Sequence, residues 1–269
     1  MVKLQNDEFE YIVNYVKRNY GLNLSKKRVL IECRLRKELE RYGLDTFKAY
    51  LQMVEKDPTH VMADEMIHRL TTHYTYFFRE PQHFEFIEKN ILPELCSKPE
   101  GFQYHVWCAG CATGEECYSL AMLFEQYKEK DSHLPYYHIT GTDVSKAVLT
   151  VARNGSYPDK ELNGFPYYWK GKFCKQNRDG TFSIADRVRR NVSFSRLNLT
   201  EPLSMRRKYD LILCRNVMIY FDTQAKKALI SNLEKCLNPG GYLMVGHSEL
   251  LSRESTKLTF VSSAVYKKE

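Results

Sequence analysis

The chain has 269 residues, 43% of them hydrophobic, and a formal net charge of +7 at pH 7. This length and apolar content suit one large domain, or a smaller domain followed by a larger one, with a buried core. No apolar run is long enough to span a bilayer, and the N-terminus has no hydrophobic signal region. We therefore expect a soluble, cytoplasmic protein that does not insert into membranes.

The first 70 residues are predicted to form an all-α bundle. Apolar residues recur at helical spacing in four short segments, and Gly21 and Gly43 end the first two. Short loops join the segments, so the helices are expected to pack on one another. The predicted helices span residues 9–20, 27–42, 46–54 and 59–70.

The second predicted helix, residues 27–42, carries much of the positive charge. Its basic side chains fall three, four or seven residues apart and share one face, which suits an acidic protein partner, nucleic acid or acidic lipid. An alternative is an ordinary solvated face held by ion pairs along the helix. The predicted inward residues are Val29, Leu30, Cys33 and Leu39, the basic residues are Lys27, Arg34, Lys37 and Arg41, and the predicted pairs are Glu32–Arg36 and Glu38–Arg41.

Residues 71–81, T-T-H-Y-T-Y-F-F-R-E-P, are aromatic and contain no glycine, so this connector is expected to pack between two parts of the chain. Beyond it, strands alternate with helices, which predicts an α/β domain with a mostly parallel sheet and helices on both faces. Residues 155–190 break the alternation, and N-R-D-G at 177–180 predicts a hairpin, so a small β insertion is expected. Predicted strands cover residues 102–106, 137–142, 192–197, 209–214, 242–245 and 258–266, and predicted helices cover 82–95 and 223–237.

The segment W-C-A-G-C-A-T-G-E-E-C-Y-S, residues 107–119, carries the strongest functional signal. A strand, a tight glycine turn and a helix follow one another, which is how a doubly wound sheet brings backbone N–H groups to a ligand. Glu115 and Glu116 stand where a dinucleotide would place its phosphates, and two carboxylates would repel a pyrophosphate. A ligand that is cationic or carries an ammonium group fits better, and S-adenosylmethionine (SAM) meets that description.

Cys108 and Cys111 have the C-x-x-C spacing of zinc and redox sites. No second cysteine pair or histidine pair at ligand spacing accompanies them. We therefore expect no metal site and interpret these cysteines as small buried residues of the turn. The eight cysteines fit free thiols in a reducing compartment.

Polar residues follow four successive predicted strands, at the edge where ligands bind in open α/β sheets. The carboxylate of Asp143 can accept hydrogen bonds from both ribose hydroxyls of a nucleoside, although Asp143 could equally be the N-cap of the next helix. Arg215 could likewise be part of a structural ion pair. Their coincidence at strand ends favours a binding site. The residues concerned are Glu115, Asp143, Asn198, Arg215 and Asn216.

Several motifs resemble the CheR-type chemotaxis methyltransferases. They are W-C-A-G-C-A-T-G-E-E, I-T-G-T-D, N-L, L-C-R-N-V-M-I-Y-F and G-H-S-E, together with T-T-x-x-T-x-F-F-R-E in the connector, in the family's order. The resemblance implies a Rossmann-like SAM methyltransferase sheet with a small inserted β subdomain, preceded by an all-α N-terminal bundle. The expected parts are an all-α domain (1–70), a packed connector (71–81) and a SAM-binding domain (82–269) with its β insertion at about 155–190.

Enzymes of this family use SAM to methylate glutamate side chains of bacterial chemoreceptors, releasing S-adenosylhomocysteine. By resemblance, Arg79 and Tyr220 would face the reacting groups. The basic helix 27–42 and the β insertion would face the cytoplasmic domain of the receptor, and the protein would be a monomer that binds no nucleic acid. The residues implied to contact the cofactor are His73, Thr75, Arg79, Glu115, Asp143, Asn198, Leu199, Arg215 and Asn216.

Two positions depart from the family pattern. His73 replaces an asparagine that can touch the cofactor, and Cys117 replaces a proline after the two glutamates. An imidazole can also donate a hydrogen bond, but its charge varies near neutral pH. The proline replacement affects only the first turn of a helix.

Two other functions stay open: a SAM methyltransferase with a different acceptor, and a non-catalytic SAM-binding adaptor. The basic helix lacks interleaved aromatic residues that would stack on bases, which argues against nucleic acid. An adaptor would not need to keep Arg79, Tyr220 and Arg215.

Overall fold

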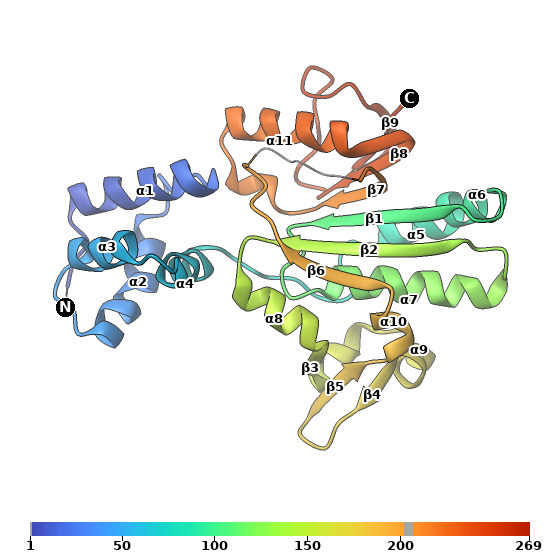
Figure 1. Ribbon diagram of the computed structural model, residues 1–269, viewed down its shortest axis with the longest axis horizontal. Coiled ribbons are helices and arrows are strands. Elements are labelled where there is room, and N and C mark those ends of the chain that lie inside the picture. The colour runs from blue at the N-terminus through green and yellow to red at the C-terminus, as the bar shows by residue number, and fades with distance from the viewer. Residues whose placement is uncertain (1, 202–206) are drawn as a thin grey trace.

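The computed structural model describes residues 2–201 and 207–269. Figure 1 shows a helical unit at the N-terminal end, a large sheet flanked by helices, and a small sheet beside it. This arrangement confirms the predicted fold class, an all-α unit followed by a mostly parallel α/β sheet with a small β insertion. Within the described ranges, no helix is both long enough and apolar enough to cross a membrane.

The helical unit packs its helices around a hydrophobic core of its own. Gly21 ends the first helix in the left-handed conformation, with a φ of 65°. The Thr46 hydroxyl caps the third helix by accepting a hydrogen bond from the Ala49 backbone N–H at 3.1 Å. The helices are α1 (Asn6–Tyr20), α2 (Arg28–Tyr42), α3 (Phe47–Lys56) and α4 (Val61–Leu70).

The buried face of α2 differs from the predicted one. Val29 is 76% exposed and Cys33 is exposed, so their predicted inward position is wrong, whereas Leu39 is buried and Leu30 is half-buried. Because α2 has apolar residues on more than one side, its contacts with α3 and α4 decide which side is buried. The buried residues of α2 are Ile31, Leu35, Glu38 and Leu39.

The large sheet has seven strands in the order β6-β2-β1-β7-β8-β10-β9, parallel from β6 to β8 and antiparallel at β10 and β9. The chain builds β1, β2 and β6 on one side and then returns to place β7 on the other side of β1. The topological switch point, where ligands bind in such sheets, therefore lies between β1 and β7. The strands are β1 (Gln103–Ala109), β2 (Tyr136–Asp143), β6 (Val192–Arg196), β7 (Tyr209–Cys214), β8 (Leu237–Val245), β9 (Thr259–Ser262) and β10 (Val265–Lys267).

The single closing strand predicted over residues 258–266 is wrong. This segment and the residue after it form two antiparallel strands, β9 and β10, and Ala264 between them has a φ of 61°. Both strands are short and apolar residues occur in each, so the sequence pattern does not reveal the turn.

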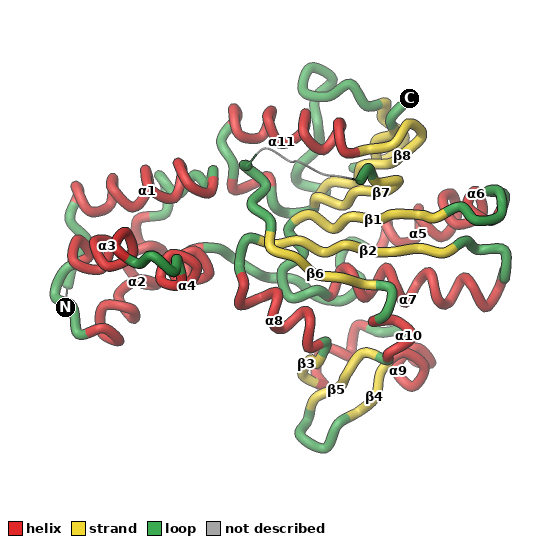
Figure 2. Tube along the Cα trace, viewed as in Figure 1, coloured by secondary structure: helices red, strands yellow, loops and turns green. Residues whose placement is uncertain are grey.

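Helices lie on either side of the sheet (Figure 2). Successive side chains of β1 enter different cores: Val106 and Cys108 pack with α7, whereas Trp107 and Ala109 pack with α11. The helix predicted over residues 82–95 is continuous but contains one π-helical turn. The helices of this domain are α5 (Pro81–Phe86), η1 (Ile87–Ile91), α6 (Leu92–Cys96), α7 (Glu115–Lys130), α8 (Lys146–Asn154), η3 (Met218–Tyr220) and α11 (Thr223–Cys236).

The insertion is a three-stranded antiparallel sheet in the order β3-β5-β4, and β4 and β5 form the predicted hairpin. Phe77 of the connector packs on the rings of Tyr157, Phe165 and Phe182, with centroids 5.0, 4.7 and 5.9 Å away. The connector is thus anchored to the insertion. Three short helical segments in it were not predicted. The elements are β3 (Ser156–Pro158), η2 (Asp159–Gly164), α9 (Tyr167–Phe173), β4 (Cys174–Gln176), β5 (Thr181–Ile184) and α10 (Asp186–Arg189).

The helical unit is held against the C-terminal ends of the parallel strands. Asp64 on α4 forms ion pairs with Arg196 at the end of β6 and with Lys146 at the start of α8. The side-chain amide of Asn198 donates a hydrogen bond to the carbonyl of Asn19 at 2.8 Å. The unit therefore lies over the edge of the sheet where ligands bind in this fold.

Candidate functional site

A cavity lies between the helical unit, the connector and the C-terminal ends of β1, β2 and β7. All the predicted site residues line it except Glu115. The structure therefore brings predicted residues from four separate sequence motifs to one place. Those that line the cavity are His73, Thr75, Arg79, Asp143, Asn198, Leu199, Arg215, Asn216 and Tyr220.

The glycine turn after β1 forms the floor of this cavity. Gly110 has a φ of 82°, and its N–H donates to the carbonyl of Thr142 at 2.8 Å. A Cβ atom at Gly110 would lie 2.4 Å from Cγ2 of Val217, so only glycine fits. The tight turn thus packs directly on the loop that follows β7.

Asp143, at the end of β2, holds the two turns that flank it. Its Oδ2 accepts a hydrogen bond from the Ala112 N–H at 3.0 Å, and its Oδ1 accepts one from the Ser145 N–H at 2.9 Å. The N-cap of α8 is Ser145, so the alternative that Asp143 caps this helix is wrong. The carboxylate is buried yet lines the cavity, and each oxygen keeps a lone pair for a ligand.

The two glutamates at the start of α7 have different surroundings. Glu115 is buried, accepts hydrogen bonds from the Thr113 hydroxyl at 2.7 and 2.8 Å, and does not line the cavity. Burial raises the pKa of Glu115 to about 7. Glu116 lines the cavity instead and pairs with Arg215 at 3.1 Å. The sequence shows two adjacent carboxylates. The orientation of the first turn of α7 determines that Glu116, and not Glu115, faces the cavity.

Arg215 is the centre of a buried ion-pair network. Its Nε and Nη2 each lie 3.2 Å from Oε2 of Glu80, and its Nη1 donates to Glu116. The side chain is 2% exposed. Arg215 therefore combines both interpretations of the sequence, since it forms a structural ion pair and also lines the cavity.

Glu249 is a residue that sequence reasoning did not assign. Its buried carboxylate accepts hydrogen bonds from the backbone N–H groups of Asn216 (2.6 Å), Ile219 (3.0 Å) and Gly246 (3.0 Å). It thus fixes the loop after β7, in which Asn216 has a φ of 59°. The sequence contained a signal for this residue, because Glu249 belongs to the motif G-H-S-E. Glu80, which was also not assigned a role, belongs to the motif F-F-R-E.

Arg79 is held at the cavity by the connector itself. Its Nη1 donates to the carbonyl of Tyr74 at 2.8 Å, and its guanidinium lies 5.8 and 5.9 Å from the ring centroids of Tyr74 and Tyr76. Among the described residues, no carboxylate forms an ion pair with it. The backbone carbonyl of Tyr220, the other predicted reacting-site residue, accepts the Asn23 N–H at 2.8 Å.

His73 is packed rather than free. Its Nε2 lies 2.8 Å from the Thr71 hydroxyl, and its ring stacks on His68 with centroids 4.9 Å apart. Burial lowers the pKa of His73, so the imidazole is neutral near pH 7. The imidazole of His73, which replaces the family's asparagine, therefore does not carry the variable charge that the sequence led us to expect. Thr75 is half-buried and Leu199 is buried beside the same cavity.

Three cysteines surround the glycine turn. Cys108, Cys111 and Cys117 are all buried, and burial raises the pKa of each thiol. The burial of Cys108 and Cys111 agrees with their interpretation as small buried residues of the turn.

Comparison with known proteins gives the same domain order. Residues 7–71 match the family model described as the CheR methyltransferase all-alpha domain, and residues 73–267 match the CheR methyltransferase SAM binding domain. A chemotaxis protein methyltransferase of Borreliella burgdorferi is 38% identical, over 99% of this chain and 96% of its own length. A probable chemotaxis protein methyltransferase of Rhizobium etli is 33% identical, over 85% of this chain and 87% of its own.

These matches cover both units of the fold and the whole cavity. The cofactor is SAM, as the residues at the turn predicted, and the activity is methyl transfer in chemotaxis. The chain belongs to the CheR methyltransferase family.

Proposed function

We propose that this protein transfers the methyl group of SAM to glutamate side chains in the cytoplasmic domains of chemoreceptors. The observation that carries the proposal is Arg79, a guanidinium at the cavity that forms no ion pair with a carboxylate of the described chain. A guanidinium binds a carboxylate in a fixed, bidentate geometry. An incoming glutamate is the partner that this position suits.

The reaction asks little acid–base chemistry of the protein. A glutamate has a reference pKa of ~4.3, so its carboxylate is ionised at neutral pH and needs no general base. SAM supplies a methyl group on a positively charged sulfur; a carboxylate oxygen forms the new bond to carbon as the carbon–sulfur bond breaks and its electron pair stays on sulfur. The protein must align these groups and exclude water.

The side chains divide this work. Arg79 keeps the acceptor ionised, because burial alone would raise the pKa of a carboxyl group and stall the transfer. Tyr220 directs the acceptor by a hydrogen bond from its hydroxyl. When SAM is bound, Asp143 would accept hydrogen bonds from its ribose, and Glu116 rather than Glu115 would face its ammonium group, because Glu116 lines the cavity.

Other residues that line the cavity are proposed to make the remaining contacts with the cofactor. Asn216, Leu199 and Thr75 bound the space for the nucleoside and the amino-acid portion. Asn198 also lines this space, although its amide bonds to Asn19 and its carbonyl oxygen accepts from Thr200. His73 contributes packing and a neutral imidazole.

We also propose that α2 docks on the receptor, but with fewer of its basic side chains than the sequence implied. Arg34 donates to the carbonyls of Arg69 and Thr71, and Arg41 pairs with glutamates of α2 and α4. The predicted ion pairs Glu32–Arg36 and Glu38–Arg41 are present, although Glu38 is buried rather than solvated. Lys27 and Lys37 are exposed and remain for an acidic partner.

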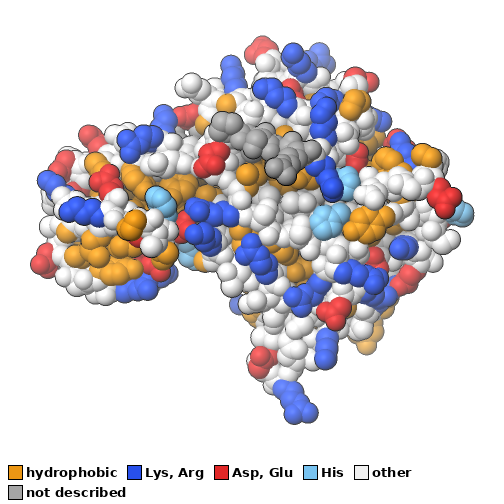
Figure 3. Space-filling view, in the orientation of Figure 1, with side chains coloured by type: hydrophobic (Ala, Val, Ile, Leu, Met, Phe, Trp, Pro, Cys, Tyr) orange, Lys and Arg blue, Asp and Glu red, His pale blue; other side chains and the backbone are white. Residues whose placement is uncertain are grey.

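The β insertion is proposed as a second receptor-facing surface. Figure 3 shows Lys and Arg side chains on the face over β6 and toward the insertion. Such a surface suits an acidic receptor helix. The protein acts as a cytoplasmic monomer and uses no nucleic acid.

The experiment is methyl transfer to receptor-containing membranes with methyl-labelled SAM, followed by mild alkali. Methyl esters release volatile methanol, whereas N-methyl and C-methyl groups do not. We expect volatile label with the wild-type chain and with Arg253→Ala, an exposed arginine that does not line the cavity, and its loss with Arg79→Ala. Stable label would assign a different acceptor. Tight SAM binding without any label would favour the adaptor function.

A further inference from the structure

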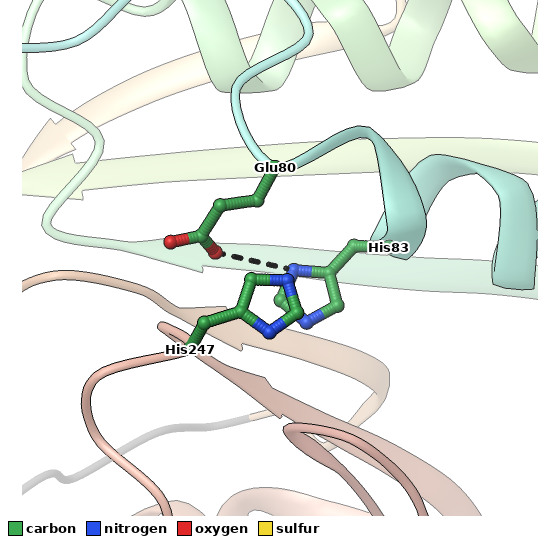
Figure 4. Close-up of side chains that lie close together, drawn as sticks. All are labelled: Glu80, His83 and His247. Carbon is green, nitrogen blue, oxygen red and sulfur yellow. Dashed lines mark ion pairs between the residues drawn. The ribbon is translucent and has the colours of Figure 1, made fainter.

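Two histidines and a glutamate from distant parts of the chain meet beside the cavity wall (Figure 4). Glu80 and His83 lie at the start of α5, and His247 lies in the loop after β8. One ligand atom from each lies within 4.8 Å of the others. Oε2 of Glu80 is 3.5 Å from Nδ1 of His83.

Three imidazole nitrogens of this cluster form no hydrogen bond within the described residues, although Nδ1 of His83 lies at ion-pair distance, 3.5 Å, from Glu80. His83 is 1% exposed, yet neither of its ring nitrogens has a hydrogen-bond partner among the described residues. The same is true of Nε2 of His247. Buried polar atoms are nearly always satisfied, so unpaired nitrogens around one point indicate a missing ligand.

The side-chain types suit a metal ion. The cluster offers two imidazoles and one carboxylate, and the Glu80 carboxylate also forms an ion pair with Arg215.

We propose that Glu80, His83 and His247 form a binding site for a divalent transition-metal ion of the zinc class. Two imidazoles and a carboxylate are a common zinc ligand set, with a remaining position for water. No pair of cysteines takes part, so C-x-x-C spacing could not reveal this site.

Ligation requires a small local movement. Zinc ligands lie about 2.0–2.2 Å from the ion, so the three side chains must approach one another from their present separation. The rings of His83 and His247 are stacked, 4.9 Å apart and 10° from parallel, so one of them must tilt. His247 can do so because it is only half-buried and lies in a loop.

A bound ion would tie the connector to the loop after β8. Glu80 already contacts Arg215 and Asn216, and Glu249 of the same loop holds the Asn216 backbone. Metal occupancy would therefore stabilise the folded cavity wall and raise the melting temperature in proportion to the logarithm of ion concentration.

The test is titration of the purified, reduced, chelator-treated full chain with Co²⁺, a spectroscopic substitute for zinc. We expect one saturable site with visible d–d absorption and no thiolate-to-cobalt charge-transfer band. His247→Gln and His83→Gln should each weaken binding by at least about tenfold, since each removes one of three ligands. The accompanying rise in melting temperature should disappear with them.

His68→Gln is the matched control. His68 belongs to the other stacked histidine pair, with centroids 4.9 Å apart, but to no such three-residue cluster in the described ranges. It should leave the cobalt spectrum and affinity unchanged. Absence of saturable absorption, a thiolate band, or equal affinity in His247→Gln would overturn the proposal. If His83→Gln does not fold, His247→Gln decides, because its side chain is half-buried.

Discussion

At the scale of single residues, Asp143 shows how one carboxylate serves two purposes. It accepts backbone N–H groups from both flanking turns and still lines the cavity. We expect Asp143→Asn to weaken SAM binding by more than about tenfold and to lower the free energy of unfolding by about 1–3 kcal/mol, since the amide can accept only one of the two N–H bonds.

Isothermal calorimetry and urea denaturation measure the two effects separately. Asp186→Asn, at an exposed position, is the control for the change of charge. Unchanged SAM affinity with reduced stability would limit Asp143 to a structural role.

Arg79 is expected to act on turnover more than on cofactor affinity. Arg79→Ala should reduce kcat by about 100-fold, the usual cost of removing one positioned charge stabiliser, while SAM affinity changes much less. Lysine at this position should restore only part of the rate, because it cannot hold a carboxylate in a bidentate geometry. Steady-state kinetics with calorimetry checks this, and equal losses in kcat and affinity would make Arg79 a binding residue only.

Glu115 gives a pH dependence whose sign can be worked out. Its pKa is raised by burial from 4.5 to about 7, so the folded state keeps a proton that the unfolded chain has lost. Unfolding therefore releases a proton in this window, and stability falls as pH rises from about 4.5 to about 7.

Glu115→Gln should remove this dependence. At pH 5 the free energy of unfolding of the variant should equal that of the wild type or be slightly lower. At pH 8 it should be higher than that of the wild type by about 1–3 kcal/mol. Urea denaturation at the two pH values measures the difference. A constant gap between the two proteins would show that Glu115 is ionised at both.

At the scale of elements, α2 illustrates why periodicity alone does not fix a buried face. Leu35 is completely buried whereas Val29 is 76% exposed, although both are apolar residues of one helix. We expect Leu35→Ala to cost about 2–5 kcal/mol of stability and Val29→Ala less than about 0.5 kcal/mol. Chemical denaturation distinguishes them, and similar costs would contradict the observed burial.

The outer side of α2 carries the docking prediction. Reversing Lys27 and Lys37 to glutamate should raise the KM for receptor about tenfold at low salt, with kcat and SAM affinity unchanged. The effect should shrink at high salt, because exposed charges are screened. The matched control reverses Lys227 and Lys235 on α11, which are also exposed. Equal KM values for both double variants would exclude α2 from docking.

At the scale of the whole molecule, the helical unit completes the cavity. Tyr20 and Leu22 line it from one side and Val217 and Phe221 from the other, and Leu22 forms a β-bridge with Phe221. The sheet alone therefore offers an open edge, and the N-terminal helices close part of it. The two parts and the packed connector could be predicted from the sequence. That the helical unit forms one wall of the cavity could not be predicted.

The sequence by itself determined the all-α front, the alternation of strands and helices behind it, the glycine turn and the positions of polar residues at strand ends. These depend on local spacing and on one general rule, that parallel strands end at a common edge. Asp143, Asn198 and Arg215 could be predicted as neighbours in this way, although they lie far apart in the chain, whereas Arg79 was placed with them only by resemblance to the family.

Only the tertiary structure decided which of the two glutamates faces the cavity, which side of α2 is buried, and that Glu80 meets His83 and His247. Each of these depends on contacts between side chains distant in sequence, and no local period encodes them. Helical and strand patterns specify which residues are apolar, but burial is fixed by the partner that packs against them. The shape of the cavity is therefore determined by tertiary packing, whereas the types of polar residue near it could be predicted from the sequence.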